Sequence, residues 1–158
     1  MKKIIPFIVL LLITASCTEK KQPVSFDNID VTIKDNWGRI YGLKLDKTGN
    51  TQVSVGGKYA KAKVEEFLIN EQILDSISNV ARRVDLAKIA PEYTDTCKKE
   101  DCVGYEIELK KGNTLVKTRV KNISKNPKIA DLDNLVTLLY NVVRTTDLDP
   151  ESLKRKEK

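Results

Sequence analysis

The residues best able to do chemistry in this chain are its three cysteines, because the sequence contains no histidine. Cys97 and Cys102 lie close together, with four residues between them. Redox-active pairs are usually separated by two residues, and a metal site would need more ligands than the nearby Glu100 and Asp101. The alternatives are therefore a structural disulfide, two free thiols, or a metal or redox site. A disulfide is favoured if the chain is exported.

Motifs for enzymatic catalysis are missing from the sequence. Without histidine there is no Ser-His-Asp triad, no Cys-His dyad and no His-ligated zinc. No serine lies in a nucleophile elbow, and residues 55–58 lack the spacing of a phosphate-binding loop. Glu106 and Glu108 could form an acid/base pair, but the hairpin expected there places a basic residue opposite each. The sequence predicts no enzymatic activity, no cofactor and no metal.

The first seventeen residues have the features of an export signal. Lys2 and Lys3 precede an apolar run over residues 4–13, and small residues follow it. An apolar run of about ten residues is too short to cross a bilayer as a helix. Residues 1–16 are therefore expected to be a signal peptide.

The end of this signal resembles the lipobox of bacterial lipoproteins. Ala15, Ser16 and Cys17 fit that motif, whereas Thr14 stands where Leu is usual. The resemblance implies that Cys17 carries a diacylglycerol and becomes the first residue of the mature chain. Thr18, in place of the Asp that retains many such lipoproteins at the inner membrane, implies the outer membrane, with either face possible. The alternative is a signal cut elsewhere that leaves Cys17 as a free thiol.

The remaining sequence divides into a tether, one domain and a tail. Residues 17–27 are expected to be the lipidated cysteine and a polar tether, residues 28–147 a single domain, and residues 148–158 a charged tail. The chain has a formal net charge of +6, but Lys2 and Lys3 lie in the signal and four more basic residues lie in the tail. No concentrated basic surface remains on the domain, so nucleic acid is not an expected partner.

Alternating apolar residues predict strands in the first half of the domain. Ile29, Val31 and Ile33 would share one face of the first strand. A three-residue loop at 47–49, with Gly49 at positive φ, would then join two further strands. The facing pairs predicted for those two strands are Leu45 with Thr51, Leu43 with Val53 and Tyr41 with Val55. Residues 59–69 are expected to be a fourth strand or the start of a helix.

Helical spacing begins at Asn70, a predicted N-cap, and continues to Val84. A second helix is expected over residues 131–144. Between the helices, a two-residue turn at Gly112-Asn113 predicts a hairpin. Its facing pairs are Lys111–Thr114, Glu108–Lys117, Glu106–Arg119, Leu109–Val116, Ile107–Thr118 and Tyr105–Val120. The expected fold is an α+β domain, an antiparallel sheet of five to six strands with two helices packed on one face.

The candidate interface is Trp37, in a turn-like segment between the first two strands, with Arg39 and Tyr41 close by. Exposed Trp, Arg and Tyr side chains commonly anchor recognition. The alternative is that Trp37 folds over the end of the sheet and is buried in the core.

The order of elements resembles small bacterial envelope lipoproteins of unknown function, through the strands, the Gly-rich turn, the helix and the Tyr-containing hairpin. We therefore expect a non-enzymatic binding or structural module, held at the membrane by lipid on Cys17, with an envelope protein or glycan as partner. An inhibitor of an envelope or extracellular enzyme is the alternative function.

Overall fold

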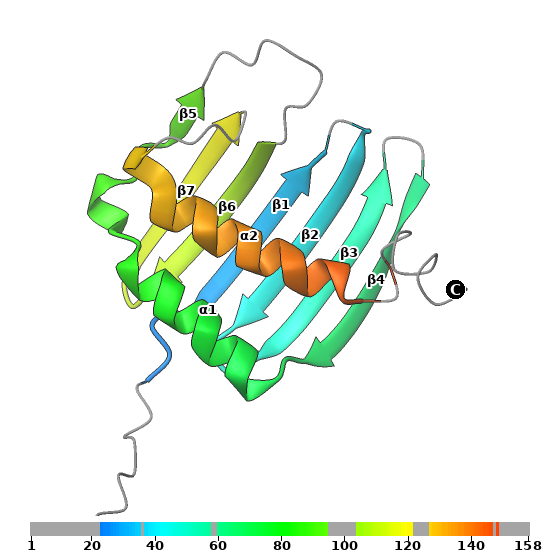
Figure 1. Ribbon diagram of the computed structural model, residues 1–158, viewed down its shortest axis with the longest axis horizontal. Helices are drawn as coiled ribbons and strands as arrows, with labels where there is room; N and C mark the ends of the chain where they lie inside the picture. The colour runs from blue at the N-terminus through cyan, green and yellow to red at the C-terminus, as the bar shows by residue number, and fades with distance from the viewer. Residues whose placement is uncertain are drawn as a thin grey trace, which may run out of the picture.

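The chain forms one mixed sheet covered by two helices. The computed structural model describes residues 23–35, 37–57, 60–94, 104–121, 127–146 and 148. Seven strands are hydrogen-bonded in the order β4-β3-β2-β1-β6-β7-β5 (Figure 1). The strands are β1 (Asn28–Lys34), β2 (Arg39–Asp46), β3 (Asn50–Gly57), β4 (Ala60–Leu68), β5 (Glu92–Thr94), β6 (Gly104–Lys111) and β7 (Thr114–Lys121). The helices are α1 (Glu71–Arg83) and α2 (Ala130–Arg144), with short 3-10 turns at Leu86–Lys88 and Pro127–Ile129.

The α+β class is confirmed, but the expected count of five to six strands is wrong. The ambiguous segment at residues 59–69 contains a full strand, β4, paired antiparallel with β3. The seventh strand is β5, whose three residues pair parallel with β7 and make the sheet mixed. Three residues are too few to show an alternating pattern, so periodicity alone could not detect this strand.

The predicted registers of both hairpins are confirmed. Tyr41 pairs with Val55 across β2 and β3, and Gly49 in the connecting loop has φ 92°. In the second hairpin, all six predicted pairs between β6 and β7 occur, and Gly112 has φ 57°. Each glycine adopts the left-handed backbone that its turn requires. The registers place most of the apolar residues of these four strands on one face.

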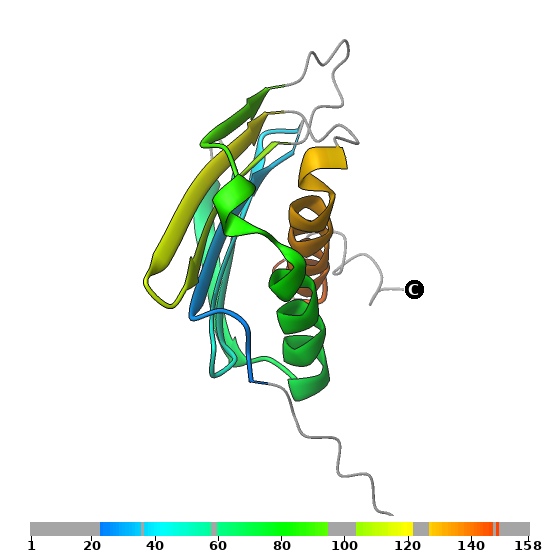
Figure 2. The same cartoon turned by 90° about the vertical axis from the view of Figure 1, so that its left-hand side faces the viewer.

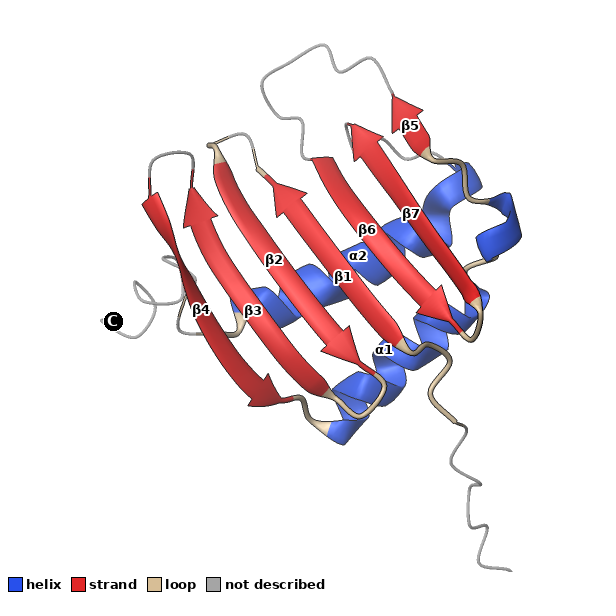
Figure 3. Cartoon of the chain, turned by 180° about the vertical axis from the view of Figure 1, so that it is seen from behind, coloured by secondary structure: helices blue, strands red, loops and turns tan. Residues whose placement is uncertain are grey.

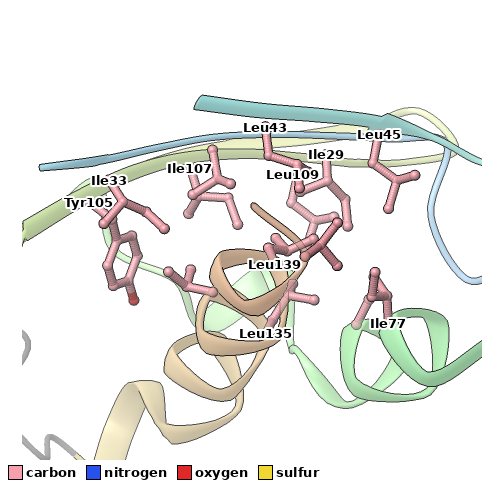
Figure 4. Close-up of a cluster of buried hydrophobic side chains, with 14 of the residues drawn as sticks. Ile29, Ile33, Leu43, Leu45, Ile77, Tyr105, Ile107, Leu109, Leu135 and Leu139 are labelled. Carbon is pink, nitrogen blue, oxygen red and sulfur yellow. The ribbon is translucent and has the colours of Figure 1, made fainter. Parts of the chain in front are cut away.

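Both helices lie on that apolar face, as Figure 2 shows, and Figure 3 shows the opposite face, which no described helix covers. The side chain of Asn70 accepts a hydrogen bond from the Gln72 amide, 2.8 Å long, which confirms the predicted cap of α1. The helices and strands meet in one core (Figure 4), where Ile77, Leu135 and Leu139 have no measurable exposure. Each such side chain stabilises the fold by about 2 kcal/mol relative to an exposed one.

The domain begins before residue 28, which is earlier than expected. Phe26 is only 3% exposed and belongs to the core. Ser25 binds α1 twice, through its amide to the Ser78 hydroxyl at 2.9 Å and through its hydroxyl to the Ser78 carbonyl at 2.6 Å. Residues 25–27 are therefore part of the folded unit and not of a tether.

Candidate functional site

The turn between β1 and β2 is held by one carboxylate, that of Asp35. Its Oδ1 accepts hydrogen bonds from the amides of Trp37 and Arg39, at 2.9 and 2.8 Å. The Asp35 carbonyl accepts from the Gly38 amide at 3.2 Å, and the Asp35 amide donates to the Arg39 carbonyl at 3.1 Å. Gly38 has φ 74°, a conformation that favours glycine. We call Asp35, Trp37 and Gly38 the Trp37 turn.

The side chain of Trp37 points into solvent from this turn. It is 86% exposed, more than any other large apolar side chain of the described residues. The interpretation that Trp37 folds over the end of the sheet and is buried is therefore wrong. The hydrogen bonds to Asp35 hold the turn in the conformation that exposes this side chain.

Arg39 and Tyr41 lie beneath the turn and have different surroundings. Tyr41 is 2% exposed, and its ring meets Tyr140 of α2 edge-on at 5.2 Å. Its hydroxyl makes long hydrogen bonds, donating to Asp35 Oδ2 at 3.4 Å and accepting from Arg39 Nη1 at 3.5 Å. The structure thus brings the three candidate residues together, but only Trp37 and the half-exposed Arg39 offer surface. Tyr41 is a core residue that supports the turn, which corrects its expected place in an interface.

The uncovered face of the sheet carries ion pairs between neighbouring strands. Arg119 of β7 contacts Glu106 of β6 at 2.8 Å, and Lys117 contacts Glu108. Further pairs join Lys44 to Asp30 and Lys121 to Glu92. Hydrogen bonding to Glu108 raises the pKa of Lys117, and hydrogen bonding to Lys121 lowers the pKa of Glu92. Glu106 and Glu108 each bind a cation across the strand, the arrangement expected for a solvated sheet face.

A shallow depression of about 800 Å³ lies on this face, near the loop between β2 and β3. Its lining combines charged and apolar side chains, among them Asp30, Lys44, Gln52, Glu66 and Leu115. Across the described ranges, no three Cys, Asp or Glu side chains come together in an arrangement that could hold a metal ion.

Sequence reasoning missed one buried polar pair. The Tyr105 hydroxyl of β6 donates to Asp133 Oδ1 in the first turn of α2, at 2.5 Å. Burial raises the pKa of both groups, and for Tyr105 the hydrogen bond to Asp133 adds to this effect. A tyrosine on the apolar side of a strand needs a hydrogen-bond partner for its hydroxyl. The position of Tyr105 in its strand was therefore the feature of the sequence that indicated a buried polar partner. The pair positions α2 on the sheet.

Several sequence-based predictions fall outside the described residues. Cys17, the proposed lipidation site, lies there, as do Cys97 and Cys102, the proposed disulfide. None of the helices in the described ranges combines the length and the apolar character needed to cross a membrane. Comparisons with known protein families and with curated proteins find no match for the chain.

Proposed function

We propose that the chain is a lipid-anchored, non-enzymatic binding module of the bacterial cell envelope, which recognises a protein or a glycan through the Trp37 turn. One observation carries the proposal: the single tryptophan of the chain is 86% exposed on a turn fixed by Asp35. Tryptophan and arginine are enriched among the residues that dominate binding energy. Trp37 and Arg39 supply both kinds of side chain at one site.

The energetics favour recognition at this position. Burying a tryptophan side chain removes roughly 150–250 Å² from water, worth about 4 to 6 kcal/mol at about 25 cal/mol per Å². The hydrogen bonds of Asp35 hold the backbone in place before a partner arrives. A turn that is already ordered loses little conformational entropy on binding, so more of the burial energy remains as affinity.

The position of the turn supports a partner other than the bilayer. β1 begins beside the N-terminal segment and ends at the Trp37 turn, so the two lie at opposite ends of the sheet (Figure 1). Seven residues of strand span about 23 Å at about 3.3 Å per residue. With lipid on Cys17, this geometry favours a turn that faces away from the membrane.

Trp37→Ala tests the proposal. The full chain and the variant are crosslinked in the native envelope, and the captured proteins and peptidoglycan fragments are quantified by mass spectrometry. We expect Trp37→Ala to reduce one specific product at least about tenfold, because truncation of such an anchor commonly costs 2 kcal/mol or more. The melting temperature should stay within about 2 °C of the original, because the ring makes no core contact. Leu115→Ala is the matched control, since Leu115 is an exposed apolar residue on the uncovered sheet face.

Equal capture by Trp37→Ala and the original chain would remove the Trp37 turn as the recognition site. Fluorescence gives an independent measurement, because Trp37 is the only fluorescent indole. Its emission should shift to the blue and become protected from acrylamide when the purified partner is added. If the captured partner is an enzyme, an activity assay with the added chain separates the inhibitor hypothesis from simple binding.

A further inference from the structure

β4 forms one edge of the sheet, and no strand in the described part of the chain pairs with its outer side (Figure 3). An edge strand of nine residues presents unpaired N–H and C=O groups that can pair with another strand. Lys63 and Glu65 of this strand have no ion-pair partner among the described residues. Two apolar side chains of β4 are also exposed, Val64 by 56% and Leu68 by 70%.

The hydrogen bonds to β3 determine which backbone groups of β4 point outward. The Ile69 amide donates to the Gly49 carbonyl at 3.0 Å, toward β3. The register continues with Phe67 opposite Thr51 and Glu65 opposite Val53. Hydrogen-bonding direction alternates along a strand, so the odd-numbered residues from Lys63 to Ile69 bond to β3, up to the register shift that the ladder has beyond Lys63. The N–H and C=O groups of Val64, Glu66 and Leu68 therefore face outward.

A second copy of the chain fits this edge in one register. Two β4 strands related by a two-fold axis perpendicular to the sheet run antiparallel, with both helix layers on the same side. With the axis at Val64, Lys63 lies opposite Glu65 of the second copy, and Glu65 lies opposite Lys63. The outward N–H of each Val64 then donates to the outward C=O of the Val64 in the other copy.

Neighbouring registers place like charges together. An axis at Lys63 places the two copies of that lysine opposite each other, and an axis at Glu65 or Glu66 does the same with the two copies of that glutamate. An axis at Ala62 places Lys61 opposite Lys63. Like charges directly opposite each other destabilise a strand pair, whereas opposite charges stabilise it. Among the axes from Ala62 to Glu66, the one at Val64 alone pairs opposite charges without setting like charges opposite each other.

We propose that the chain forms a two-fold dimer through β4, with the axis at Val64 and reciprocal pairs between Lys63 and Glu65. The continuous sheet of the dimer has fourteen strands, twice the seven of one copy. Edge pairing buries a modest area, so the dimer forms reversibly and depends on concentration. The Trp37 turn lies between β1 and β2, away from the β4 edge, and stays accessible in each copy.

Sedimentation velocity of the full chain in a non-ionic detergent tests the dimer over a wide concentration range. Lys63→Glu and Glu65→Lys should each raise the dissociation constant of the dimer at least about tenfold, because each creates two repulsive pairs at the axis. The double variant Lys63→Glu/Glu65→Lys should restore the original constant. Lys110→Glu makes the same change of charge on β6 and should leave dimerisation unchanged. Circular dichroism melts of all variants establish that the fold is retained.

Monomer at every concentration would overturn the proposal. So would a dimer that neither single charge reversal weakens, because that result indicates another surface or two chains sharing a micelle. A third contrary result is failure of the double variant to recover dimerisation. Capture of a different protein that binds β4 and competes with the second copy would also contradict the proposed dimer.

Discussion

At the scale of residues, one aspartate stabilises each of the two turns that flank β2. Asp35 accepts the hydrogen bonds of the Trp37 turn, and Asp46 accepts those of the loop before β3. Asp46 Oδ1 accepts hydrogen bonds from the Thr48 amide at 2.8 Å and from the Thr48 hydroxyl at 2.6 Å. Oδ2 accepts from the Asn50 side chain at 2.9 Å. The carboxylate thereby accepts hydrogen bonds that water would otherwise accept from the N–H and O–H donors of the loop.

The bonds from Thr48 lower the pKa of Asp46 from 3.8 to about 2, with further bonds from Asn50 acting in the same direction. A carboxyl whose pKa is lower in the folded state stabilises the fold above its unfolded pKa. That contribution is lost as the pH falls from about 4 to about 2.

We predict that Asp46→Ala lowers the free energy of unfolding by about 1 to 2 kcal/mol at neutral pH, since exposed hydrogen bonds to a charged group fall at the low end of their range. The difference from the original chain should shrink toward zero near pH 2. Urea unfolding across this pH range measures both effects. Asp75→Ala, a change at a partly exposed position of α1, serves as the control, and a loss independent of pH would contradict the role given to the carboxylate.

The Trp37 turn shows what residue types alone could predict. The sequence indicates a turn at Asp35 and Gly38, and an anchoring role or a core role for Trp37. The choice between them depends on the distance between the turn and the core, which no local pattern contains. The burial of Tyr41, in contrast, could be predicted from the sequence, because its alternation with Leu43 and Leu45 already indicated the apolar face.

At the scale of elements, the hairpins were predictable because two independent constraints agree. Turn chemistry at Gly49 and Gly112 fixes the loop lengths, and only the observed registers place apolar residues opposite one another. The strand β5 has no such support. Its pairing with β7 depends on where the chain arrives after α1 and its 3-10 turn, and this is a tertiary property.

The C-terminal end of α1 depends on a side chain from the second hairpin. Lys111 Nζ donates to the carbonyls of Ala81 and Val84, at 2.6 and 2.9 Å. These carbonyls lie at a helix end where intrahelical partners run out. Burial lowers the pKa of Lys111. The ammonium thus ties the hairpin to the helix.

We predict that Lys111→Met lowers the free energy of unfolding by about 1 to 2 kcal/mol, because two buried carbonyls lose a charged donor while the aliphatic packing is kept. Lys110→Met is the matched control, since Lys110 is exposed on the uncovered face and should change stability by less than about 0.5 kcal/mol. Chemical denaturation compares the two. Equal losses would show that lysine removal in general, and not the helix end, is responsible.

At the scale of the whole molecule, one layer of helices on one sheet leaves three surfaces for contact. The uncovered face carries ion pairs between neighbouring strands, β4 offers an open edge, and the Trp37 turn projects from one end. The sequence predicted the layering, because alternating strands with two amphipathic helices permit few other arrangements. It could not predict the open edge, since the spatial order of strands arises from pairings between β1 and β6, far apart in the chain.

The boundary between the folded unit and the proposed anchor separates residues that stabilise the fold from the residue that would attach the chain to the membrane. Phe26 is a single aromatic residue in a polar segment, so its place in the core could not be read from periodicity. Cys17 lies six residues before Pro23, where the described structure begins. We therefore predict that residues on the two sides of Pro23 control different properties.

Phe26→Ala should lower the free energy of unfolding by about 3 kcal/mol, the usual minimum for truncating a buried phenylalanine, and should leave the protein in the membrane fraction. Cys17→Ser should do the reverse, abolishing incorporation of labelled fatty acid and moving the chain to the aqueous phase at an unchanged melting temperature. Thr18→Ala, beside the lipidation site, should preserve both properties. Labelled lipid on the Cys17→Ser chain would place the anchor elsewhere. A shift in its melting temperature would mean that the proposed tether contributes to the fold, because a purely external anchor adds no native contact.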